Sequence, residues 1–91
     1  MITIDLSKVV FVQNYFEGNG FGMFKVYFQD YYLWFRWDYN DARSRLDQKS
    51  KIQKVCQDLI NAKSSGSSVF DIDGYDMGGI SSIPAYKEFL K

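Results

Sequence analysis

The sequence predicts an α+β fold, in which three or four antiparallel strands form a sheet and one long helix packs on one face. More than half of residues 23–39 are aromatic, and apolar positions alternate at period two on both sides of Gln29 and Asp30, which is typical of two paired strands. After Asp38 the apolar spacing becomes helical. With 91 residues, of which 46% are hydrophobic, we expect one compact domain over residues 1–91.

Three strands are predicted before the helix, and a weakly alternating segment at residues 2–6 could begin a strand or a short edge segment. After that segment, the strands in chain order are residues 8–16, 21–29 and 31–39. In the strand at residues 8–16, Val9 and Phe11 are expected on one side and Val10 and Val12 on the other, because successive strand residues point to opposite faces. The Asn-Gly pair at 19–20 predicts a tight turn before the strand at residues 21–29, since these residues tolerate positive φ.

Residues 42–63 are predicted to form the long helix. Its start is indicated by a capping box, in which Ser44 precedes Asp47 by three residues. Its buried stripe at helical spacing consists of Ile52, Val55, Cys56, Leu59 and Ile60. Lys63 and Gly66 are typical of a helix C-terminus.

Two shorter elements are predicted after this helix. Residues 69–73 alternate as a strand, with Phe70 and Ile72 on one side. Ser82 can cap a short final helix with Pro84 in its first turn, where a proline removes no helical hydrogen bond. The residues expected to face inward from that helix are Ile83, Tyr86, Phe89 and Leu90. The predicted order is strand–strand–strand–helix–strand–helix, preceded by the weak N-terminal segment.

No set of side chains indicates catalysis, and we expect a protein that is not an enzyme and has no cofactor. The chain has no histidine, so Cys56 lacks the usual base that would activate it as a nucleophile. One cysteine also excludes an internal disulfide and a cysteine-clustered metal site. Asp71, Asp73 and Asp76 lie close together in the sequence, but the glycine spacing does not fit a calcium-binding loop. We therefore expect no metal site.

The N-terminus and the apolar runs give an expected location. No apolar run approaches the roughly 20 residues of a membrane-spanning helix. Asp5 and the missing basic segment are unlike a signal peptide, so we expect a cytoplasmic protein without membrane contact.

The side of the sheet away from the long helix, here called the outer face, is the predicted binding site. The predicted core residues of the central strands are Phe24, Val26, Phe28, Leu33, Phe35 and Trp37. The predicted outer-face residues are Lys25, Tyr27, Tyr32, Trp34, Arg36 and Asp38. Aromatic residues and arginine are enriched in binding hot spots. Two alternatives remain open: the final helix covers this face, or a homodimer closes over it.

A second candidate site is basic. Residues 43–63 hold six of the eleven basic residues and two of the eleven acidic ones. Arg45 and Lys49 project on the apolar side of the helix, and with Arg43 they could hold an anion or a nucleic-acid backbone. The alternative is that their long stems cover the rim of the core while the charged ends reach water.

Two functions follow from these patterns. The first is a small protein-binding module that sterically inhibits a partner protein, and in size and style the chain resembles phage-encoded anti-defence proteins and immunity proteins. The second is a weak single-stranded nucleic-acid-binding domain, in which the outer-face aromatics stack on bases and the basic helix follows the phosphates. A net charge of zero favours protein binding over nucleic-acid binding.

Overall fold

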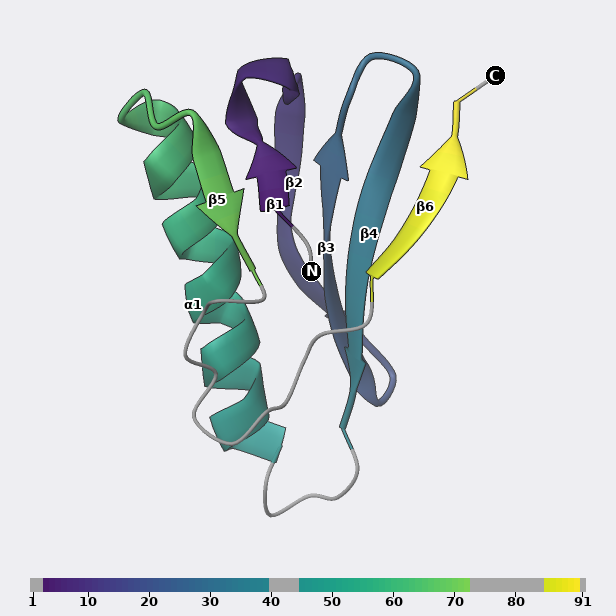
Figure 1. Ribbon diagram of the computed structural model, residues 1–91. Coiled ribbons are helices and arrows are strands. Elements are labelled where there is room, and N and C mark those ends of the chain that lie inside the picture. Colours follow the sequence, from purple (N-terminus) through teal and green to yellow (C-terminus); the bar gives the residue numbers. More distant parts are fainter. Residues whose placement is uncertain (1–2, 40–44, 73–84, 91) are drawn as a thin grey trace.

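A four-stranded antiparallel sheet with one long helix packed against it dominates the computed structural model, which describes residues 3–39, 45–72 and 85–90 (Figure 1). The elements in chain order are β1 (Thr3–Asp5), the 3-10 helix η1 (Leu6–Lys8), β2 (Phe11–Gly18), β3 (Phe21–Tyr27), β4 (Tyr31–Asp38), α1 (Arg45–Ser64), β5 (Val69–Asp71) and β6 (Ala85–Phe89). The predicted α+β class is confirmed.

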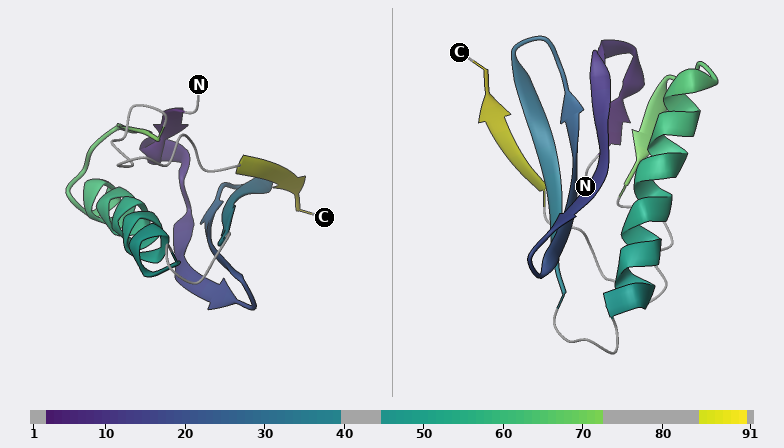
Figure 2. Two further views of the ribbon diagram at one scale, coloured as in Figure 1. Left: turned by 90° about the horizontal axis from the view of Figure 1, so that it is seen from below. Right: turned by 180° about the vertical axis from the view of Figure 1, so that it is seen from behind.

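The order of the strands places β6 at one edge of the sheet. The main sheet runs β2-β3-β4-β6, and all three pairings are antiparallel. A separate two-stranded ribbon joins β1 to β5. α1 packs on β2 and β3, so β6 lies at the edge farthest from the helix (Figures 1 and 2).

Two short turns set the register of the central strands. The Phe28 N–H donates to the Tyr31 carbonyl at 2.8 Å, so the β3–β4 hairpin turns at Gln29 and Asp30 as predicted. The predicted turn between β2 and β3 is also present, and Gly20 alone takes a positive φ there, 81°. Glycine adopts this conformation without the steric cost that other residues meet.

A β-bulge interrupts β2. The pairing with β3 is regular as far as Gln13 and resumes at Phe16, which lies opposite Met23. Val12 and Tyr15 both pack against the core. The extra residue therefore changes which side of the sheet each later β2 residue faces, and simple alternation along β2 does not hold.

The core lies between the sheet and α1, where the sequence predicted it. Phe24 and Phe35 are fully buried, and their rings stack with centroids 4.9 Å apart. From α1, four residues of the predicted stripe are fully buried: Ile52, Val55, Cys56 and Leu59. Ile60 is partly buried against them. The long helix is thus held by the packing of its apolar stripe on the sheet.

The end of α1 also agrees with the prediction. Gly66 has a φ of 86°, its N–H bonds to the Lys63 carbonyl, and the Ser67 N–H bonds to the Ala62 carbonyl. This pair of bonds is the Schellman motif, which satisfies carbonyls at the end of a helix. The predicted capping box at the start of the helix lies outside the described residues.

The predicted final helix is wrong in the part of the chain that the structure describes. Residues 85–89 form β6, which pairs with β4 and places Tyr86 beside Trp34. Tyr86, Phe89 and Leu90 are exposed instead of facing inward. The physical reason is that a helix of this length is marginal alone, whereas pairing satisfies the edge of β4 and adds cross-strand aromatic contacts.

Two other predicted strands are present with altered surroundings. The strand predicted at 69–73 is β5, which pairs with β1 instead of the main sheet. Ile72 is buried, and residue 73 lies outside the described residues. The strand predicted to begin at residue 8 begins at Phe11. Val9 is buried and Phe11 is exposed, so the prediction that they share one side is wrong. Lys8 ends η1, which breaks the alternation there.

No helix within the described residues has the length and apolar character needed to cross a membrane.

Two neighbouring residues of β4 provide a test of which face is buried. Phe35→Ala should remove about 3–5 kcal/mol, a large part of the free energy of unfolding of a domain this size. Trp34→Ala should leave the protein folded, because Trp34 lies on the other face. Urea denaturation followed by circular dichroism measures both. An unfolded Trp34→Ala beside a stable Phe35→Ala would invert the assignment of the two faces.

Candidate protein-binding face

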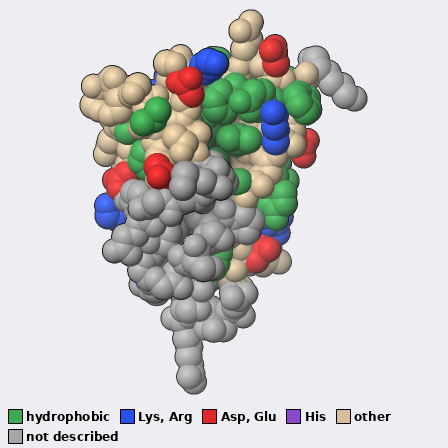
Figure 3. All heavy atoms as spheres, in the orientation of Figure 1, with side chains coloured by type: hydrophobic (Ala, Val, Ile, Leu, Met, Phe, Trp, Pro, Cys, Tyr) green, Lys and Arg blue, Asp and Glu red, His purple; other side chains and the backbone are tan. Residues whose placement is uncertain are grey.

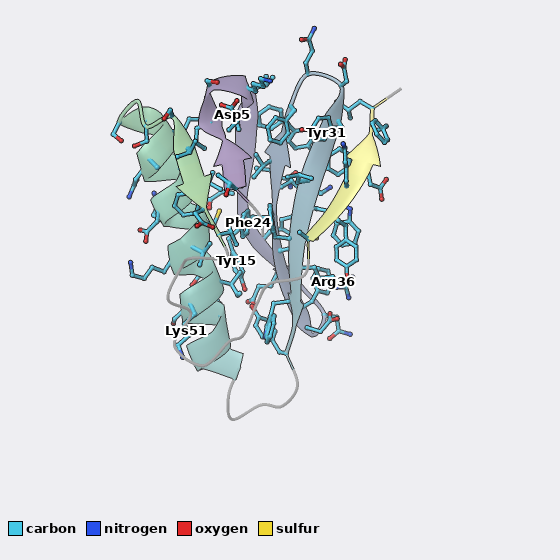
Figure 4. All side chains as sticks on the ribbon, in the orientation of Figure 1. Asp5, Tyr15, Phe24, Tyr31, Arg36 and Lys51 are labelled. Carbon is cyan, nitrogen blue, oxygen red and sulfur yellow. The ribbon has the colours of Figure 1, made fainter. Side chains whose placement is uncertain are left out.

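The register of β3 and β4 brings the six predicted outer-face residues together on one side of the sheet. Lys25 lies opposite Trp34, Tyr27 lies opposite Tyr32, and residues directly opposite one another share a face. Arg36 and Asp38 follow on the same side at period two. In Figure 4 Phe24 and Tyr15 lie between the sheet and α1, whereas Arg36 lies on the side away from α1. The predicted placement is therefore correct.

Stacked rings run across the outer face from strand to strand. The Phe11 and Tyr27 rings are 4.3 Å apart, and the Tyr27 and Tyr32 rings are 5.1 Å apart. On the next pair of strands, Trp34 stacks on Tyr86 at 4.1 Å. Each ring is held by a neighbour, so the aromatic residues are ordered before any partner arrives.

The structure adds Phe11 and Tyr86 to the face, and the sequence missed both. Phe11 is 51% exposed and Tyr86 is 45% exposed. The alternation that predicts a shared side for Val9 and Phe11 fails because β2 begins only at Phe11. For Tyr86, the local helix signals are misleading, and its alternation with Glu88 is the strand signal in the sequence.

Cationic groups lie over rings of this face. The guanidinium of Arg36 lies 4.0 Å from the centre of the Phe21 ring, and its Nε donates to Asp38 Oδ1 at 2.9 Å. The Lys25 ammonium lies 5.3 Å from the centre of the Tyr32 ring. These contacts restrict the long side chains and keep their charged ends beside the aromatic surface.

A shallow hollow of about 220 Å³ lies in the middle of the face. It is lined by Met23, Lys25, Tyr32, Trp34, Arg36 and Glu88. Loss of water contact, followed by the nearby Glu88 carboxylate, raises the pKa of the Tyr32 hydroxyl. That hydroxyl is therefore neutral at physiological pH, and its hydrogen bond with the Glu88 carboxylate contributes to the same shift.

Charges on the outer face balance. Among the described residues, its charged side chains are two basic ones, Lys25 and Arg36, and two acidic ones, Asp38 and Glu88. Arg36 and Asp38 also form an ion pair at 2.9 Å. The face is consequently aromatic and close to neutral, a character closer to protein interfaces than to phosphate-binding grooves.

The basic residues predicted for anion binding are not joined to this face. The Lys49 ammonium binds Glu17 Oε1 at 3.0 Å and links α1 to β2, on the opposite side of the sheet from Trp34. Arg45 begins α1, and the placement of its side chain is not described, while Arg43 lies outside the described residues. The anion-binding role of the three residues stays a prediction.

A polar cluster beside the Lys49–Glu17 pair serves the packing of α1 on the sheet. The Tyr15 hydroxyl hydrogen-bonds with the Tyr39 hydroxyl and with Glu17. Burial, followed by the bond to Tyr39, raises the pKa of Tyr15. A Cβ at Gly22 would overlap both hydroxyls, so the absence of a side chain there makes room for the pair.

Cys56 has the surroundings of a structural residue. Its side chain is fully buried, and its Sγ lies 3.4 Å from Asn14 Oδ1. Burial raises the pKa of the Cys56 thiol to about 11, so the reactive thiolate is scarce at neutral pH. Within the described part of the chain, no group of three acidic or cysteine side chains is placed to hold a metal ion.

Comparison with known proteins gives no match: no family model, no curated protein and no solved structure aligns significantly with this chain. The interpretation of the outer face therefore depends on its own geometry and chemistry.

The raised pKa of Cys56 predicts a loss of stability in alkali. The thiol loses its proton near pH 9 in the unfolded chain and near pH 11 in the folded one, so this stabilisation is complete below pH 9 and is lost as the pH rises. Between pH 8 and pH 10 the wild type should lose about 1 kcal/mol more free energy of unfolding than Cys56→Ala. Equal losses in urea titrations of the two proteins would show that the thiol is not buried.

Proposed function

We propose that this protein is a non-enzymatic module that binds a partner protein through the outer face and inhibits it by occupying its surface. The observation that supports this proposal is the row of partly exposed, mutually stacked aromatic side chains on the side of the sheet that α1 leaves uncovered. Tyrosine and tryptophan dominate binding energy in protein interfaces, because they bury large areas with few rotatable bonds.

Each residue has a distinct role in the proposed interface. Trp34, Tyr27 and Tyr32 are the anchors, and their stacking lowers the entropy lost when a partner orders them. The charged side chains around them orient the partner: Lys25, Arg36 and Asp38. Charge arrangement of this kind contributes specificity more than affinity.

The balance of charge favours a protein over a nucleic acid as the partner. Binding of a single strand needs a cationic path for phosphates beside the stacking rings. The outer face is close to neutral, and Lys49 pairs with Glu17 on the other side of the sheet. Nucleic-acid binding is thus the weaker of the two functions, and the test below includes it as an outcome.

The proposed setting is the cytoplasm, in the manner of phage-encoded anti-defence proteins or immunity proteins. A module of this kind needs no catalytic group, since one firmly held copy blocks one target. A homodimer closed through the same face would compete with the partner for the same aromatic residues.

The test is capture of a partner on the tagged full chain from a bacterial lysate, followed by measurement of affinity for the purified captured protein. Trp34→Ala should retain the fold and weaken binding by at least about 2 kcal/mol, the loss typical of a hot-spot residue. The matched control is Val69→Ala, an exposed apolar residue on β5 that lies outside the face.

Salt and nuclease separate the outcomes. Affinity for a protein partner should change little between low and physiological salt, whereas phosphate contacts make affinity fall steeply. Prey that is lost on nuclease treatment would support the nucleic-acid function instead. Equal affinity for wild type, Trp34→Ala and Val69→Ala would contradict any binding role for the outer face.

A further inference from the structure

Among the strands that the structure describes, β6 pairs on one side of its backbone only, with β4. The Leu90 N–H donates to the Asp30 carbonyl at 2.9 Å, which continues the β4–β6 pairing by one residue. In an antiparallel pair, alternate residues exchange these bonds, so Glu88 and Tyr86 also bond toward β4. The residues whose peptide N–H and C=O groups point away from β4 are Ala85, Lys87 and Phe89.

This edge is a regular template for another strand. The five residues of β6 pair with β4 without a register shift, and among the described strands none pairs with its other side. The opposite edge of the sheet is different, because the bulge in β2 interrupts its ladder. Bulges blunt an edge against strand addition, and β6 lacks that protection.

Apolar side chains at the edge are exposed as well. Phe89 is 71% exposed, and it lies on the side of β6 that faces away from Tyr86. In Figure 3, hydrophobic side chains surround a basic one over the part of the sheet where β4 and β6 lie. Side chains of an added strand would therefore find an exposed apolar neighbour on each face of the sheet, Tyr86 on the outer face and Phe89 on the other.

The charged side chains of β6 determine which residues are favoured on an adjoining strand. The Lys87 ammonium is 4.2 Å from the centre of the Tyr31 ring and 4.9 Å from that of Phe89, on the side opposite the outer face. Glu88 lies on the outer face near Tyr32. An adjoining strand is favoured when it carries an acidic residue opposite Lys87 and a basic residue opposite Glu88.

A second copy of the chain does not meet this requirement. Antiparallel pairing of two β6 strands around a two-fold axis places a residue opposite itself. If all five residues of β6 overlap, Lys87 lies opposite Lys87 of the second copy. If the strands shift toward the C-terminus, Glu88 lies opposite Glu88, so like charges face one another in both registers. In either shifted register only three residues of each β6 strand overlap.

We infer that β6 takes an extended segment of the partner protein as an added strand, with an acidic side chain opposite Lys87 and a basic one next to it. This inference rests on the proposed function and deepens it. The added strand would lie beside Tyr86, whose ring stacks on Trp34 at the β6 end of the outer face. Backbone bonds then give affinity, and the alternating charges give specificity.

The probe is a synthetic peptide of alternating threonine and valine, blocked at both ends, with adjacent aspartate and lysine at its centre. Titration into isotope-labelled wild-type protein should shift the amide signals of Lys87 and Phe89 and reach saturation. The same peptide with N-methylated backbone amides keeps its side chains but cannot pair, so it should not bind. No binding by the first peptide, or equal binding by both, would overturn the inference.

Reversal of the charge at Lys87 tests whether the added strand carries an acidic residue opposite it. Lys87→Glu should weaken binding of the peptide about two- to five-fold, the effect of one cross-strand pair. Replacement of the peptide's aspartate by lysine, which keeps the lysine opposite Glu88, should restore binding to that variant. The control with the same change of charge is Lys54→Glu, on the exposed side of α1, and it should bind as the wild type does. Equal effects of the two substitutions would show a general charge effect and contradict the inference.

The two proposals fail separately. Loss of partner capture on Trp34→Ala, without any binding of the peptide, would support the outer face and reject strand addition. Binding of the peptide at Lys87 and Phe89, with no effect of Trp34→Ala on the captured partner, would reject the outer face and retain the edge.

Discussion

The register of the β3–β4 hairpin is the constraint on which the rest of the structure depends. The turn at Gln29 and Asp30 sets Phe24 opposite Phe35, and it sets Lys25 opposite Trp34. A slip of one residue would exchange the two faces, exposing the stacked phenylalanines and burying a lysine. The register is therefore strongly favoured, because only one alignment gives α1 an apolar surface to cover.

The two faces use aromatic residues in different ways. On the core side, Phe24 and Phe35 stack beneath α1 and contribute to stability. On the outer face, Trp34 and Tyr86 stack on each other and remain partly open to water. The same interaction thus fills the core on one side and holds a surface in a fixed shape on the other. Restricted rings lose less entropy on binding, which is the basis of the proposed function.

Period-two and helical spacing were sufficient to predict the faces of β3 and β4 and the buried stripe of α1, because both depend on local sequence. The C-terminal segment was not predictable in this way. Ser82 and Pro84 are local helix signals, whereas β6 forms by pairing with β4, which lies far away in the sequence. Short apolar segments are ambiguous between helix and strand when only periodicity is considered.

The candidate site was predicted in part for the same reason. Trp34 and its neighbours follow from the alternation in β4, but Tyr86 reaches the outer face only through strand pairing. Phe11 was misplaced because η1 ends just before β2 and breaks the alternation. The ion pair of Lys49 with Glu17 also depends on how α1 lies on β2, which no local pattern specifies.

Hydroxyl-radical footprinting of the free protein, read by mass spectrometry, tests the central claim that one aromatic face is covered and the other is open. We predict rapid oxidation of Phe11, Trp34 and Tyr86, with Phe24 and Phe35 unmodified until the protein unfolds. Oxidation of Phe24 and Phe35 in the folded protein, or protection of Trp34 and Tyr86, would contradict this account.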